Sequence, residues 1–99
     1  MHYLLFYDYD HDYLERRAQF RTEHLTLAWQ AQERGELILA GALADPYDSA
    51  VLVFKADSPA VVEAFAAADP YVINKLVTQW CVRPWDTVVG ADAENPMRP

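Results

Sequence analysis

The order of apolar and helical segments limits this chain to few folds. Four runs rich in apolar residues predict strands: residues 2–7, 36–43, 50–56 and 76–85. Helical patterns separate the first strand from the second and the third from the fourth. The predicted order is β-α-β-β-α-β. It is typical of the ferredoxin-like α+β sandwich, in which a four-stranded antiparallel sheet carries both helices on one face.

The first helix is expected to be the longest element. Asp12, followed by Glu15 three positions later, forms a capping-box variant, and helical spacing then continues from Leu14 to Gln32. Gly35 is a natural stop. Thr22 is a candidate second cap that would divide this helix.

The second helix has clear signals at both ends. Ser58-Pro59 is an N-cap followed by proline at the first helical position. Asp69-Pro70 ends the helix, because proline cannot continue it and also restricts the residue before it. A short irregular or helical piece then leads to the last strand.

Both faces of the predicted sheet are apolar. In the first strand Tyr3, Leu5 and Tyr7 point to one face, while Leu4 and Phe6 point to the other. The third strand has the same pattern. Two helices cover only one face, so we expect a homodimer packed through the sheet faces.

The 99 residues are expected to form one domain. Residues 1–89 hold all the predicted strands and helices. Residues 90–99 contain two prolines, small residues and charges, and we expect them to be a loosely ordered tail.

Charge argues against nucleic acid as a partner. The formal net charge is −7, whereas phosphate binding needs a basic stripe. Arg16, Arg17 and Arg21 form the only basic concentration, and nearby acids balance it. A solvated helix face explains most of this cluster.

No membrane or export signal occurs in the sequence. The first residues are not those of a signal peptide, and no apolar run approaches membrane-spanning length. The one cysteine, Cys81, cannot form an internal disulfide, so a reducing cytoplasm is expected. Its strand-like surroundings predict a buried, inert thiol.

We expect neither a metal nor a cofactor. Around His11, the residues Asp8, Asp10 and Asp12 mimic the opening of a calcium loop. The glycine due at the sixth position is missing, and Gln19 stands where the bidentate glutamate belongs. Transition-metal spacings and nucleotide-binding loops are also absent from the sequence.

His24 is the candidate catalytic histidine, whereas His2 is expected to face solvent. His24 lies mid-helix on the same face as Arg21, and most mid-helix histidines are structural or surface residues. In the predicted fold, however, the helices run antiparallel on one face, so Asp69 can approach His24. A carboxylate fixes the tautomer of a neighbouring imidazole and promotes proton transfer near neutral pH. A carboxylate at a helix C-terminus also suggests a cationic partner.

Four motifs in this order resemble those of the YciI-like (YCII-related) family. They are R-x-x-H-L at residues 21–25, L-A-G at 39–41, A-x-A-D-P-Y-V at 66–72 and V-R-P-W at 82–85. The resemblance implies a dimeric ferredoxin-like fold of the dimeric α+β barrel type, with a pocket centred on a histidine and an aspartate.

The residues that match these family positions form the predicted site. His24 and Asp69 would be catalytic, and Arg21, Ser49 and Tyr71 would bind substrate. Several aromatic residues could line an apolar cavity, although core packing explains at least half of them. They are Trp29, Tyr47, Tyr71, Trp80 and Trp85.

We expect a small cofactor-independent enzyme, a lyase or isomerase. His24, held by Asp69, would transfer protons in elimination or isomerisation of a small aromatic or lactone-like molecule. The resembled family includes a dehydrochlorinase acting on a chlorinated hydroxyquinol. Two alternatives stay open: a non-catalytic small-ligand-binding or regulatory homodimer, and a cofactor-free oxygenase of the dimeric α+β barrel type.

Overall fold

The computed structural model describes residues 1–99. Its elements are β1 (His2–Tyr9), α1 (Tyr13–Arg16), the 3-10 turn η1 (Arg17–Gln19), α2 (Arg21–Glu33), β2 (Leu37–Ala42), β3 (Ser49–Lys55), α3 (Pro59–Ala68), α4 (Pro70–Ile73) and β4 (Val77–Trp85). The strands form one sheet in the order β2-β3-β1-β4, and every neighbouring pair is antiparallel. The predicted ferredoxin-like α+β fold is confirmed.

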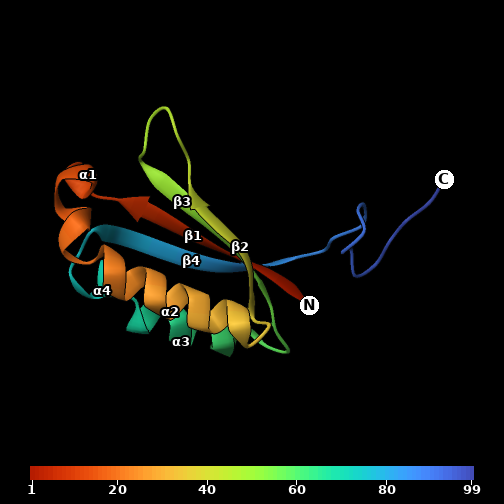
Figure 1. The fold of residues 1–99 in the computed structure, drawn as a ribbon. Helices are drawn as coiled ribbons and strands as arrows, with labels where there is room; N and C mark the ends of the chain where they lie inside the picture. Colours follow the sequence, from red (N-terminus) through yellow and green to blue (C-terminus); the bar gives the residue numbers. More distant parts are fainter.

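The two long helices cover one face of the sheet (Figure 1). Helix α2 packs against β2, and α3 packs against β4 and β1. Helix α4 contacts α2, α3 and β4. The end of α3 therefore lies beside α2, as the antiparallel arrangement of the two helices predicts.

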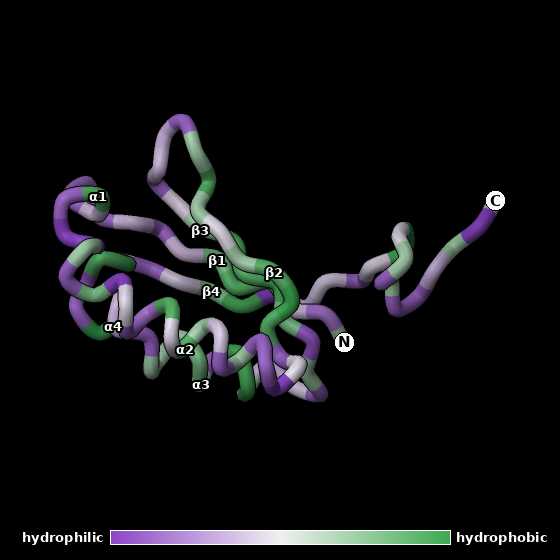
Figure 2. The backbone as a smooth tube through the Cα atoms, viewed as in Figure 1, coloured by the Kyte–Doolittle hydropathy of each residue, from purple (hydrophilic) through white to green (hydrophobic).

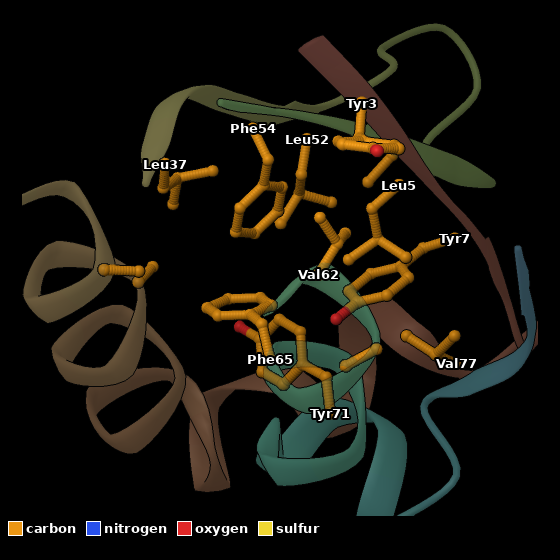
Figure 3. Packing of buried hydrophobic residues seen from close by; sticks show 14 of the residues in the cluster. Tyr3, Leu5, Tyr7, Leu37, Leu52, Phe54, Val62, Phe65, Tyr71 and Val77 are labelled. Atoms are coloured by element: carbon orange, nitrogen blue, oxygen red, sulfur yellow. The ribbon is translucent and has the colours of Figure 1, made fainter. Parts of the chain in front are cut away.

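The core lies between the sheet and α3 (Figure 3). Leu5 of β1 pairs with Leu52 of β3, and both side chains are buried toward the helices. From α3, Val62 and Phe65 meet them at helical spacing. Burial of each such side chain contributes about 1.5–3 kcal/mol.

The other sheet face has no covering layer in the chain. Leu4 pairs with Val53 and Phe6 pairs with Val51, and these four side chains are half-buried. Cys81 lies opposite Phe6 and is exposed. The prediction of a buried thiol is wrong, because β4 is an edge strand and Cys81 belongs to the uncovered face.

The long first helix is divided into three pieces. The break before α2 lies at Phe20, whose backbone (φ −118°, ψ −1°) departs from helical values. Neither predicted cap forms. Asp12 makes no side-chain capping hydrogen bond to α1, and the start of α2 has no side-chain cap at all.

The other helix-end predictions are confirmed. The Ser58 hydroxyl oxygen accepts a hydrogen bond from the Ala60 N–H at 3.3 Å, with Pro59 in the first turn of α3. Helix α2 ends at Glu33, and Gly35 follows with a φ of +79°, a conformation that glycine adopts without steric cost.

The C-terminal segment leaves the sheet beside the N-terminus (Figure 1). Figure 2 shows a mostly hydrophilic chain at its end and at the tip of the β2–β3 connection. His2 is buried, with Nδ1 2.8 Å from the Thr87 hydroxyl, so the expectation that it faces solvent is wrong. Thr87 lies in the segment that follows β4, and its side chain contacts His2. No helix in the structure combines the length and apolar composition needed to cross a bilayer.

Candidate active site

Asp69 sits at a junction between two helices. It is the C-cap of α3 and also the N-cap of α4, and Pro70 forces this change of direction. Its carboxylate is completely buried, and Oδ1 accepts the Tyr71 N–H at 3.0 Å. The helix C-terminus alone suggests a cationic partner for Asp69, but the start of α4 supplies a neutral N–H donor as well, so its partner need not be cationic.

His24 is the second partner of this carboxylate. Its Nδ1 lies 2.8 Å from Asp69 Oδ1, and its side chain is 15% exposed. When Asp69 is ionised and the imidazole is neutral, Nδ1–H donates and Nε2 keeps a free lone pair. Nε2 makes no hydrogen bond within the protein. The Tyr71 ring stacks on the imidazole, with centroids 3.9 Å apart and planes 6° apart, which fixes the orientation of the ring.

Tyr7 is a third partner, which the sequence pattern assigns only to one apolar face of the first strand. Its hydroxyl donates to Asp69 Oδ2 at 2.7 Å. Burial, reinforced by the negative charge of Asp69, raises the pKa of Tyr7, so the hydroxyl stays protonated and remains a donor. The available signal was a tyrosine inside an apolar strand, because a buried phenol needs a hydrogen-bond partner.

A cavity of about 690 Å³ opens between α2 and the β2–β3 side of the sheet. His24, Arg21 and Tyr71 line it, so three predicted site residues come together there. The full lining is Tyr7, Tyr9, Tyr13, Arg17, Arg21, His24, Leu25, Ala28, Trp29, Gln32, residues 37–42, Tyr47, Ala50, Leu52 and Tyr71. The face of α2 that the sequence spacing predicts, from Arg21 to Gln32, therefore lines this cavity.

Among the predicted cavity aromatics, Trp29 and Tyr47 also line the cavity. Trp80 and Trp85 do not; they lie on β4 and are partly exposed. The edge position of β4 explains the difference, because the cavity lies at the opposite end of the strand order, next to β2.

A wall of tyrosines and one arginine extends the site beyond the predicted residues. Tyr9 and Tyr13 stack with centroids 3.6 Å apart, and Tyr13 meets the Tyr71 ring edge-on at 5.8 Å. The Arg17 guanidinium carbon lies 5.6 Å from the centre of the Tyr13 ring. Burial raises the pKa of Tyr71 to about 12 and is also the main cause of the raised pKa of Tyr9. These phenols are therefore neutral near pH 7.

The remaining predicted site residue, Ser49, lies elsewhere. It is the first residue of β3, where it pairs with Asp8, and its hydroxyl donates to Asp48 Oδ1 at 3.1 Å. It does not line the cavity, because the alternate residues Ala50 and Leu52 face that side of the sheet. No three metal-ligating side chains converge anywhere in the chain.

Known proteins resemble this chain in sequence and in fold. The YCII-related domain matches residues 1–86. No curated protein matches the chain. A solved structure of 5-chloro-2-hydroxyhydroquinone dehydrochlorinase from Burkholderia phenoliruptrix AC1100, in complex with 2,5-dihydroxybenzoquinone, is similar with a TM-score of 0.76 and 18% identity, over 95% of this chain and 100% of that chain. The likeness shows a fold of the dimeric α+β barrel type. Since the domain match spans nearly the whole chain, the protein belongs to the YCII-related (YciI-like) family.

Proposed function

We propose that this protein is a small cofactor-independent enzyme, a lyase or isomerase that moves a proton with the His24–Asp69 dyad. One observation carries the proposal: His24 Nδ1 lies 2.8 Å from the buried Asp69 carboxylate, while the ring lines the cavity. That arrangement leaves Nε2 as a base for a bound molecule.

The proton transfer follows from this geometry. Nε2 takes a proton from an O–H or C–H group of the substrate, and the Nδ1–H···Asp69 hydrogen bond stabilises the imidazolium that forms. In an elimination the substrate loses its leaving group with the bonding electrons. In an isomerisation Nε2 returns the proton to another atom of the substrate. Such assistance contributes about 10²–10⁴-fold in rate.

The proposed substrate is a small aromatic or lactone-like molecule that lies among the cavity aromatics. Trp29, Tyr47 and Tyr71 supply flat apolar surfaces. The dehydrochlorinase with the similar fold carries out an elimination and binds a six-membered ring compound. Arg21 and Tyr71 are proposed to contact the ligand. Ser49 lies outside the cavity lining and does not belong to the proposed site.

The experiment compares His24→Gln with His11→Gln on a panel of chlorinated hydroquinones, halogenated phenols and lactones. His11 is the matched control because its side chain is 91% exposed, outside the cavity lining. We expect His24→Gln to lower kcat about 10²–10⁴-fold for any compound turned over, and His11→Gln to leave kcat unchanged. Chloride release or absorbance follows the reaction.

Three outcomes would contradict the proposal. Equal rates for His24→Gln and the unmodified protein would remove the dyad from catalysis. Binding of panel compounds without any turnover would favour the non-catalytic ligand-binding protein. Oxygen uptake during turnover would instead favour the cofactor-free oxygenase.

We also propose that the chain acts as a homodimer packed through the uncovered sheet face. The half-buried side chains of Leu4, Phe6, Val51 and Val53 and the exposed Leu39 support this assignment. Monomeric soluble proteins rarely leave large contiguous apolar patches exposed.

A further inference from the structure

The charge of the cavity is opposite to that of the chain. The sequence has 15 acidic residues and 8 lysines and arginines. Two of those basic residues, Arg17 and Arg21, line the cavity, and no aspartate or glutamate does. Such a separation of charge favours a negatively charged ligand in this place.

Neither guanidinium group is paired with a carboxylate. Arg16 pairs with Asp12, and Arg34 pairs with Glu36, but neither Arg17 nor Arg21 forms an ion pair. The pKa of Arg17 is raised, chiefly by the Tyr13 hydroxyl, and no carboxylate contributes to that shift. Arg16 is held by Asp12 and by the Asn74 carbonyl oxygen, whereas Arg17 and Arg21 line the cavity.

The buried carboxylate of Asp69 does not cancel the charge of the two arginines. Asp69 is completely buried and does not line the cavity. It already accepts hydrogen bonds from the Tyr7 hydroxyl and the Tyr71 N–H and contacts His24 Nδ1. The two arginine charges exceed the single charge of this carboxylate.

The walls near the arginines are flat and neutral. Tyr13 lies between the Arg17 guanidinium and the Tyr71 ring, which in turn stacks on His24. Because burial raises the pKa of Tyr71, its phenol offers a hydroxyl donor and a ring face without negative charge.

We propose that the ligand of this cavity is an aromatic anion, a ring bearing a carboxylate or phenolate oxygen that Arg17 and Arg21 bind. The ring lies along the tyrosine wall with its reacting group toward His24 Nε2. The inference rests on the proposed function in that the cavity is the substrate site. Beyond the proposed function, this inference assigns a negative charge to the substrate and gives Arg17 a role in binding it. Neutral lactones are therefore disfavoured as substrates.

Binding of matched anionic and neutral probes tests this inference by calorimetry. The carboxylate pair is 2-hydroxybenzoate and 2-hydroxybenzamide. The phenolate pair is 4-nitrophenolate and 4-nitroanisole, at a pH where the phenol is ionised. We expect at least one anion to bind about tenfold more tightly than its neutral partner, and added salt to weaken only the anion. The pair that discriminates identifies the oxygen group.

Arginine variants locate the effect. Arg17→Gln and Arg21→Gln should each weaken binding of the anion about 10- to 100-fold, the range for hydrogen bonds to charged groups, and leave the neutral probe within about twofold. Arg34→Gln is the matched control, because Arg34 pairs with Glu36 and does not line the cavity. It should change neither affinity.

Failure of this inference is distinguishable from failure of the proposed function. If neither anion binds more tightly than its neutral partner, or if both cavity-arginine variants behave like Arg34→Gln, the aromatic-anion assignment is overturned. That result leaves the His24→Gln rate comparison intact. Conversely, preferential anion binding together with an unaffected His24→Gln rate supports the ligand class and contradicts the dyad.

Discussion

At the scale of single residues, the site is organised around one buried carboxylate with three partners. Asp69 contacts a helix side chain (His24), a strand side chain (Tyr7) and a backbone N–H (Tyr71). Burial of a carboxylate is costly unless hydrogen bonds satisfy it. These partners offset that cost and hold Asp69 in one position, so the imidazole has one orientation.

Tyr7→Phe tests this positioning role. The change leaves one lone pair of the buried carboxylate without its donor, which should lower the free energy of unfolding by about 1–3 kcal/mol. We also expect a lower kcat with little change in KM, because Tyr7 acts through Asp69. Urea denaturation and steady-state kinetics measure the two effects.

Tyr3→Phe is the matched control for that variant. Tyr3 is buried on the same face of β1, and its hydroxyl makes no hydrogen bond within the protein. It should therefore retain nearly full stability and kcat. If Tyr7→Phe behaves like Tyr3→Phe, the Tyr7–Asp69 hydrogen bond has no role in positioning the dyad.

At the scale of elements, two interruptions shape the site. Pro70 separates α3 from α4 and turns the Asp69 side chain into the interior. The break at Phe20 separates η1 from α2, so Arg17 and Arg21 belong to different elements but line the same cavity. The positions of these ends, together with the packing of α2 on β2, decide the geometry of the dyad and of the arginines.

Ser58→Ala tests the start of the helix that leads to Asp69. Loss of the Ser58–Ala60 capping hydrogen bond should lower the free energy of unfolding by about 1 kcal/mol. The change lies at the opposite end of α3 from Asp69, so kcat should be retained. Ser49→Ala is the control, since Ser49 caps no helix; equal stability of the two variants would show that the cap contributes nothing.

At the scale of the whole molecule, the sheet has one face covered by helices and one without a cover. The uncovered face carries Phe6, Val51 and Val53 in neighbouring register positions. Contact with a second copy through this face would remove apolar surface from water at about 25 cal/mol per Å².

If the proposed dimer forms, Val51→Lys should shift it toward monomer, because the change places a charge in the proposed interface. Val89→Lys is the control, since Val89 is 85% exposed on the C-terminal segment. Sedimentation velocity across a range of concentrations measures the shift. A wild-type protein that remains monomeric at high concentration, or an unchanged Val51→Lys dimer, would argue against this interface.

The sequence predicts those features of the fold and site whose signal lies within a short stretch of residues. Strand periodicity, the Ser58-Pro59 start, the Asp69-Pro70 stop and Gly35 are written in short stretches, and the fold followed from their order. His24 and Asp69 were paired because the element order alone brings the two helices together. Predictions that needed burial failed more often: Cys81 is exposed and His2 is buried, because edge position and the segment after β4 are tertiary properties.

The sequence by itself determined the strand and helix order and the family motifs, and it predicted that His24 lies beside Asp69, as their 2.8 Å contact shows. Only the tertiary structure decided that Tyr7 completes the carboxylate site, that Ser49 lies outside it, and that Arg17 and Arg21 line a cavity without acidic residues. The reason is physical: periodicity assigns a residue to a face, but hydrogen bonds and charge depend on which faces meet, and that requires distances between elements far apart in the chain.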